Sequence, residues 1–386
     1  MLYNNCDLRI AQGEETNMET ALSSQISENI PGIDSTMPDT SRSPVSFHYQ
    51  GEVPEFVGAE IERLYGNLYA SLPHLTFEER LGKASTYVVC EQGKLTVVLL
   101  YEVSGNKVTV LNEVIDIGRT EIVRFTSYLF RELEHVSVIF FRAIHTDIRP
   151  IPFKIQRLNY LEDMMIRLPD GEDEYAAMLS PKTRSNVRRK MKSIKSDYPS
   201  FEIRIVEKDD IQEAQIRELI AFNHARMSGK KKISTFAETE RQRLIQLTKR
   251  SGVMTLAFID GRICGGIINY RIGKNYFCLM VTHDPKYNEY SLGLLCNYRA
   301  ICEAIAHHAL ELHFLWGRYH YKYALLALPK ELDVVAIYRS RYHFLLNAGT
   351  AVKAYGMWFR RKLSLWKHQQ KQNKGVFYRV AKLALK

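Results

Sequence analysis

The feature that most constrains this chain is a single order of segments that occurs twice. Three apolar segments joined by glycine turns span residues 86–115, and three more span 253–284. The first turns, 92–94 and 260–262, are 168 residues apart, and so are the second turns at 105 and 273. Short apolar runs between glycine turns indicate strands. The chain therefore predicts two three-stranded antiparallel sheets related by an internal repeat.

Each set of strands is followed by a helical pattern and one more strand. Residues 121–134 place Ile122, Phe125, Leu129 and Leu133 on one helix face, and 136–141 is an apolar strand. The second set continues with a helix over 290–308 and a strand over 310–316. Between the sets, 153–165 reads as a linking strand and 211–250 as helices. We therefore expect an α/β (α+β) chain with two mixed-sheet units in tandem.

Four segments follow from these patterns and from composition. Residues 1–45 are polar with few aromatics, so we expect an N-terminal disordered segment. Residues 46–165 form the first unit, 166–350 the second, and 351–386 a basic amphipathic helical tail. The start lacks a basic end followed by an apolar core, and no apolar run approaches the roughly 20 residues that span a bilayer. We expect a cytoplasmic protein.

The net charge of +10 is concentrated near the C-terminus. No acidic residue follows Asp333, whereas twelve Lys and Arg do, so the rest of the chain is nearly neutral. Apolar residues recur in this tail at helical spacing, at Val352, Tyr355, Phe359, Leu363 and Trp366. Trp beside Lys and Arg suits an anionic membrane surface. The tail would equally suit tRNA, or it could pack on its own domain.

The second unit carries short motifs in a fixed order. They are Leu179-Ser180 with Arg184 and Arg188-Arg189, then His224-Ala-Arg226, Asp284-Pro285, Ser291-Leu-Gly293, and Gly317 with Tyr321-Lys322. From about residue 179 to 328 this set resembles the CelD-like branch of GNAT acyltransferases, found in bacterial polysaccharide and surface-lipid loci. The branch usually has an aromatic where this chain has Met227, and a proline in the small-Pro-Gly helix opening. The first unit resembles the double-GNAT FemAB-like enzymes, which use aminoacyl-tRNA, in pattern only.

The resemblance implies two GNAT-like units, with the acyl donor in the gap where the 310–316 strand splays from its neighbour. It suggests Tyr321 as an acid for the leaving group and Lys322 as an electrostatic stabiliser. His283 and Asp284 would be the base for the acceptor. Each has a plainer interpretation: an aromatic surface loop for the first pair, and a capped turn at Asp284.

Binding roles follow from the same resemblance. The donor would contact Ser291 and Gly293 at a helix start, and Gly317, Arg184 and Arg188. The acceptor would contact His224 and Arg226. A plain helix start, a solvated arginine face and a structural histidine are the alternatives. No metal ligand set is expected.

The predicted activity is transfer of an acyl group from acyl-CoA or acyl carrier protein to an amine or hydroxyl of a sugar, lipid or amino acid. Cell-envelope or polysaccharide biosynthesis is the expected setting. Enzymes that bind coenzyme A usually carry Arg/Gln-x-x-Gly-x-Gly/Ala, and here only Gly293 remains. Two alternatives stay open. One is aminoacyl transfer from tRNA, and the other is a non-catalytic module that binds anionic membrane or RNA.

Overall fold

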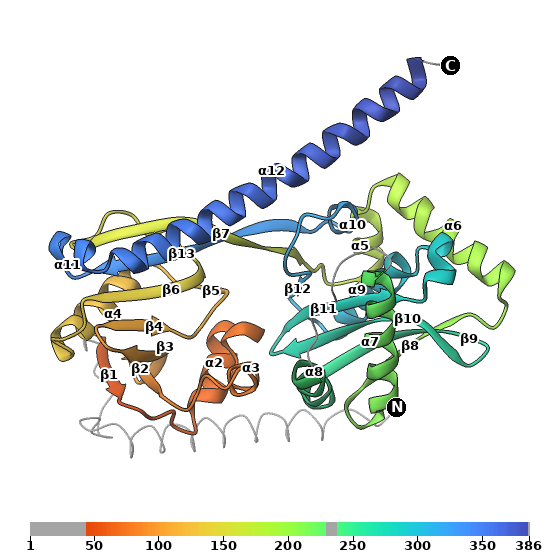
Figure 1. Ribbon diagram of the computed structural model, residues 1–386. Coiled ribbons are helices and arrows are strands. Elements are labelled where there is room, and N and C mark those ends of the chain that lie inside the picture. Colours follow the sequence, from red (N-terminus) through yellow and green to blue (C-terminus); the bar gives the residue numbers. More distant parts are fainter. Residues whose placement is uncertain (1–43, 229–237, 385–386) are drawn as a thin grey trace, which may run out of the picture.

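The computed structural model describes residues 44–228 and 238–384, with side chains described as far as residue 366. Nearly all of the segment 1–45, expected to be disordered, lies outside the described residues. Within the described ranges, the strands form one continuous thirteen-stranded mixed sheet, and helices pack on both of its faces (Figure 1).

The first unit places three antiparallel strands beside a parallel one. Its strands are β1 Val45–Tyr49, β2 Ala84–Glu91, β3 Lys94–Ser104, β4 Lys107–Val110, β5 Ile115–Asp116 and β6 Val138–His145. Its helices are α2 Val57–Tyr65, η1 Leu68–Ala70, α3 Leu72–Phe77 and α4 Arg119–Glu132. β2, β3 and β4 are antiparallel, and β6 runs parallel to β4. α4 buries Ile122, Phe125 and Leu129, as their spacing predicts.

The second unit repeats this arrangement. Its elements are α5 Glu172–Met178, α6 Pro181–Asp197, β8 Glu202–Glu207, η2 Lys208–Asp210, α7 Glu213–Ser228, α8 Glu238–Ser251, β9 Gly252–Ile259, β10 Arg262–Ile272, β11 Asn275–His283, η3 Pro285–Tyr290, α9 Leu292–Ala306, β12 Glu311–His313 and α10 His320–Ala324. β9, β10 and β11 are antiparallel, and β12 is parallel to β11. α6 and α9 pack on one face of these strands, and α7 and α8 on the other.

The internal repeat is confirmed by the strand positions. β2 and β9 begin at residues 84 and 252, β3 and β10 at 94 and 262, and β4 and β11 at 107 and 275. The matching turns also share one geometry. Gln92 and Gly93 have φ of 53° and 76°, and Asp260 and Gly261 have 50° and 73°. Positive φ at both central residues is the type I′ turn, whose twist suits a two-residue hairpin.

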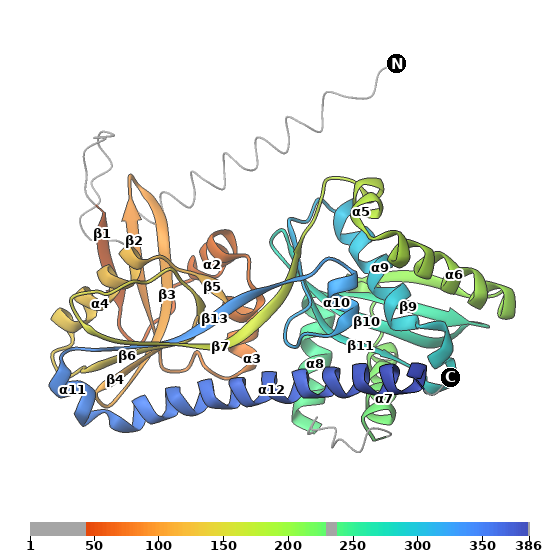
Figure 2. The same cartoon turned by 90° about the horizontal axis from the view of Figure 1, so that it is seen from above.

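Two long strands join the units. They are β7 Lys154–Arg167 and β13 Leu328–Tyr338. β13 lies between β6 and β7, and β7 pairs in turn with β12 of the second unit. The last strand of the chain therefore adds to the sheet of the first unit, while β7 extends that of the second. Figure 2 shows the two strands running together from one unit to the other. The boundary between the two units, expected between residues 165 and 166, stays a proposal.

The chain ends in two helices, α11 Arg341–Leu346 and α12 Ala348–Ala384. α12 packs beside β7 and β13 through the buried Ala351 and Ala354. Gln156 Nε2 donates a hydrogen bond to the carbonyl oxygen of Ala351 at 3.2 Å. The apolar stripe noted in the sequence lies on the other side of α12 and is exposed. In the part of the chain that the structure describes, no helix is both long and apolar enough to cross a membrane.

Candidate active site

The parallel strand of the second unit is shorter than its sequence suggests. An apolar strand was expected over 310–316, but β12 ends at His313. Leu315 has φ of 56°, a conformation that a leucine adopts only under constraint, and the chain turns there. β11 continues to His283 although its pairing with β12 ends at Phe277. A gap therefore opens between the end of β11 and the chain beyond β12.

Lys322 holds this turn in place. Its ammonium donates to the carbonyl oxygens of Phe314 at 2.7 Å, Leu315 at 3.1 Å and Trp316 at 2.7 Å. The residue is only 2% exposed, and burial lowers its pKa to about 8. An ammonium has three hydrogen atoms to donate, and all three are engaged by backbone. This geometry favours a positioning role over the direct contact with a reacting oxygen that the sequence suggested.

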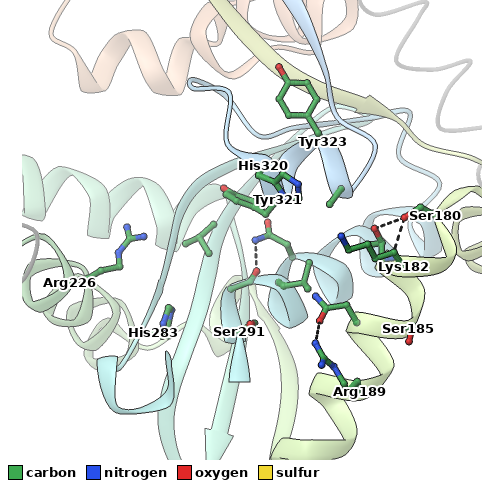
Figure 3. Close-up of a pocket in the computed structure, with 17 residues that line it drawn as sticks. Ser180, Lys182, Ser185, Arg189, Arg226, His283, Ser291, His320, Tyr321 and Tyr323 are labelled. Carbon is green, nitrogen blue, oxygen red and sulfur yellow. Dashed lines mark hydrogen bonds between the residues drawn. The ribbon is translucent and has the colours of Figure 1, made fainter. Parts of the chain in front are cut away.

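Tyr321, the neighbour of Lys322, faces the opposite way, into a pocket of about 980 Å³ (Figure 3). Its ring stacks on Tyr319 with centroids 6.2 Å apart and meets the edge of Phe314 at 6.3 Å. Burial raises the pKa of the Tyr321 phenol, so the group keeps its proton at neutral pH. Ring packing and the anchored turn together fix the direction of this hydroxyl.

The start of α9 forms the floor of the same pocket. Ser291 and Gly293 line it, and Ser291 has φ of 56° and ψ of 44° at the N-cap position. Asn297, one turn further along, also lines it and donates to the Gly293 carbonyl oxygen at 2.5 Å. The first turn of a helix presents backbone N–H groups and a partial positive charge. The floor is therefore suited to an anionic group.

Cations lie on both sides of the pocket. Lys182 and Arg189 project from α6, and Arg226 projects from α7 on the opposite side (Figure 3). Arg226 Nη2 donates to Asn223 Oδ1 at 3.0 Å, which orients the guanidinium. None of the described residues that line the pocket is acidic. The electrostatics favour a ligand that carries negative charge, such as a phosphate or pyrophosphate.

His283 lines the pocket and Asp284 does not. His283 Nε2 lies 2.8 Å from Asn288 Oδ1. Asp284 caps η3, because its Oδ1 accepts from the backbone N–H of Lys286 at 3.0 Å. This is the capped turn considered as its plainer interpretation, so of the two residues only His283 faces the pocket.

Four expected binding residues lie elsewhere. Arg184 and Arg188 line a separate hollow of about 390 Å³, and Arg184 donates to the carbonyl oxygens of Ala176 and Ala177. His224 lies beside Arg217 and Arg241 in another hollow of about 340 Å³. Gly317 lines a cavity of about 500 Å³ next to α12.

Sequence reasoning missed several lining residues, among them Asn186, Asn297 and His320. Lys182, Asn186 and Arg189 recur every three or four residues, which places them on one face of α6. Arg184 and Arg188 lie nearly opposite, on the other side of the buried stripe of Thr183, Val187 and Ile194. The helical period separates the two sets, but which set borders the 980 Å³ pocket depends on how α6 packs against α9.

A second polar cluster lies behind β12. His313 Nδ1 is 2.5 Å from Asp163 Oδ2, and its Nε2 is 3.3 Å from Glu311 Oε2. The His313 ring also stacks on Phe277 with centroids 4.4 Å apart. Burial alone would lower the pKa of His313, but the two carboxylates outweigh it and raise the pKa to about 9. The imidazolium therefore ties β12 to β7 at neutral pH.

The comparisons agree with this architecture. Residues 181–323 match the family model described as an acetyltransferase (GNAT) domain, so the second unit is similar to a GNAT-type acetyltransferase domain. The match includes the pocket and the turn anchored by Lys322. No curated protein matches the chain.

Two solved structures resemble the whole tandem arrangement. FemX has a TM-score of 0.52 at 11% identity, with 72% of this chain and 95% of that chain covered. A conserved protein of unknown function from Bacteroides thetaiotaomicron VPI-5482 has a TM-score of 0.50 at 13% identity, covering 74% and 96%. At these identities the likeness concerns the fold, which is two GNAT-like units in tandem.

Proposed function

We propose that the second unit transfers an acyl group from an anionic thioester donor, acyl-CoA or acyl carrier protein, to an amine or hydroxyl acceptor. One observation carries the proposal: a protonated, oriented Tyr321 phenol shares a pocket with a helix N-terminus and three cations. A donor phosphate group against α9 or Arg189 would place its thioester in the gap beyond β11.

The reaction then follows from two proton transfers. The nitrogen or oxygen of the acceptor attacks the thioester carbonyl carbon and gives its proton to His283. The carbon–sulfur bond breaks, and Tyr321 donates its proton to the departing thiolate. Lys322 acts through the backbone by holding the turn that carries Tyr321. Arg226 lies on the side of the pocket opposite α6 and is the residue we assign to the acceptor.

The acceptor class stays a prediction from the motifs. They suggest a sugar, lipid or amino acid in cell-envelope or polysaccharide biosynthesis, as in the CelD-like branch. One sequence observation keeps aminoacyl transfer as the second candidate. α9 opens on Ser291-Leu-Gly293, with a single glycine where binders of coenzyme A usually have a glycine-rich turn. An aminoacyl ester donor would need the same leaving-group acid, with an alkoxide in place of the thiolate.

The test combines donor binding with turnover. The full chain is offered acetyl-CoA, longer acyl-CoA, acyl carrier protein thioester and aminoacyl-tRNA, and retained donors are identified by native mass spectrometry. We expect a thioester to be retained and free thiol to be released when amines or alcohols are added. Tyr321→Phe should bind the donor equally but release thiol about 100-fold more slowly. Tyr342→Phe, a distant exposed tyrosine, is the matched control.

Three results would redirect the assignment. Full activity in Tyr321→Phe would remove the acid role. Retention of aminoacyl-tRNA alone would establish the second candidate. Retention of no donor, with anionic vesicles or RNA still bound, would identify a non-catalytic binding module.

A further inference from the structure

Exposed apolar side chains are concentrated on the last two helices. Of the fifteen large apolar side chains that are exposed among the described residues, eight lie on α11 and α12. They are Tyr342, Leu345, Leu346, Val352, Tyr355, Phe359, Leu363 and Trp366, with exposed fractions between 38% and 70%. We call these eight residues the outer stripe. Exposed apolar side chains concentrated in this way on two consecutive helices mark an interaction site.

The outer stripe is not the face through which α12 packs on the sheet. α12 already packs on β7 and β13 through a different face, with Ala354 completely buried. Arg361, on that inner face, binds Glu162 on β7 and lies 3.4 Å from Asn159 Oδ1. The five stripe residues of α12 are spaced by three or four positions, so they share the opposite side of the helix. Figures 1 and 2 show α12 along the outside of the molecule, and among the described residues none covers its outer side.

Positive charge borders the outer stripe. Lys353 and Arg360 lie on one side of it along α12, and Lys362 lies on the other, and all three are exposed. Glu162, the acidic residue that α12 contacts, is buried and paired with Arg361 and Arg318. No Asp or Glu occurs in the chain after Asp333, so neither helix carries an acid. A surface that is apolar in the middle and cationic along both margins complements one that is apolar inside and anionic outside.

We propose that α11 and α12 dock on an anionic lipid bilayer, lying in the plane of the membrane. The outer stripe enters the boundary between headgroups and acyl chains, and Lys353, Arg360 and Lys362 contact lipid phosphates. Aromatic rings are suited to this boundary, and Tyr355, Phe359 and Trp366 supply them. The catalytic proposal is not needed for this inference, because no residue of the 980 Å³ pocket takes part.

Sedimentation with vesicles tests the proposal on the full chain. Vesicles of phosphatidylcholine containing phosphatidylglycerol should pellet the protein, and vesicles of phosphatidylcholine alone should pellet much less. Replacing Phe359 and Trp366 together by Ser should lower binding about tenfold or more, since each removes an apolar anchor. Leu310→Ser with Leu328→Ser is the control, because these residues are as exposed but lie outside α11 and α12.

Two charge-reversal variants isolate the electrostatic contribution to vesicle binding. Lys353, Arg360 and Lys362 changed together to Glu should abolish the preference for phosphatidylglycerol. The same reversal at the exposed Lys83, Lys94 and Arg262 should leave it largely intact. Higher salt should weaken binding of the natural protein, because surface charges are screened within about 8 Å at physiological ionic strength.

Two outcomes would overturn the proposal. One is vesicle binding that is absent, or equal for the stripe variant and its control. The other is a dimer in analytical ultracentrifugation that Phe359→Ser with Trp366→Ser converts to a monomer, because a second copy of the chain would then cover the outer stripe. Circular dichroism on each variant confirms that α12 is still folded.

Discussion

The Lys322 ammonium lies 2.7 Å from the carbonyl oxygen of Trp316, six residues earlier in the chain. It also donates hydrogen bonds to the carbonyl oxygens of Phe314 and Leu315, so one buried positive charge holds the backbone just after β12. The polar side chains that follow β12 therefore point in two directions. Lys322 secures the backbone from inside, while Tyr321 points into the pocket.

Replacing Lys322 should therefore affect stability before chemistry. Lys322→Met leaves three carbonyl oxygens without their donor, and we expect the free energy of unfolding in urea to fall by about 3 kcal/mol. Lys249→Met, an exposed control, should change it by less than about 0.5 kcal/mol. A Lys322→Met protein of unchanged stability but lost turnover would restore the direct role that the motif suggests.

Two arginines on nearly opposite sides of α6 should separate donor binding from folding stability. Arg189→Ala removes a pocket cation, so the dissociation constant of an anionic donor should rise about tenfold with unchanged thermal stability. Arg184→Ala removes donors to the Ala176 and Ala177 carbonyls, so stability should fall by about 1–3 kcal/mol with unchanged donor affinity. Titration calorimetry and thermal melts measure the two effects, and the reverse pattern would place the donor in the hollow beside Arg188.

Stability should depend on pH through His313. Its folded pKa of about 9 exceeds the usual 6.5, so the folded state binds the additional proton between these values. The stabilisation is complete below pH 6.5 and is lost as pH rises through 9, by about 3 kcal/mol at most. His313→Gln should abolish this loss in urea titrations between pH 6 and 9. An unchanged pH slope in the variant would assign the titration to another group.

The pairing of Glu162 with two arginines should anchor α12. The carboxylate is almost completely buried, Arg318 Nε donates to it at 2.6 Å, and Arg361 binds the same oxygen. Glu162→Gln removes the charge both cations need, so the free energy of unfolding should fall by about 3 kcal/mol. Hydrogen exchange should rise in residues 351–361. Glu132→Gln, in an exposed pair with Arg131, should alter neither measurement, and equal effects of the two variants would show that α12 is held by other contacts.

The repeated strands and helices were predictable because their signals are local. The turns at Gly93 and Gly261 mark hairpins, and the apolar spacing of Phe125 and Leu129 marks the buried face of α4. The order of these elements resembles a tandem GNAT-like arrangement, and that resemblance predicted the fold. Tyr321, His283, Ser291, Gly293 and Arg226 were also predicted, and the structure brings these five together in one pocket.

The remaining features depend on distant contacts. Nothing within β13 shows that Val335 pairs with Phe141 of the first unit, nearly two hundred residues earlier. The burial of Lys322 likewise depends on the turn at Leu315, which no periodicity reveals. Whether Arg189 or Arg188 faces the ligand depends on how α6 lies against α9. Patterns within a segment identify the element, whereas its neighbours decide which side is used.

Because β13 of the second half of the chain pairs with β6 of the first unit, the sheet can be completed only late in synthesis. A ribosome releases residues 45–167 long before it releases β13, so β6 must wait for a neighbour that arrives after the whole second unit. During translation the edge of β6 is open to pairing with other chains, which makes the nascent protein prone to aggregate. Truncation before residue 328 would make that state permanent. Neither unit should therefore fold stably when it is produced without the other, because each sheet lacks a neighbouring strand.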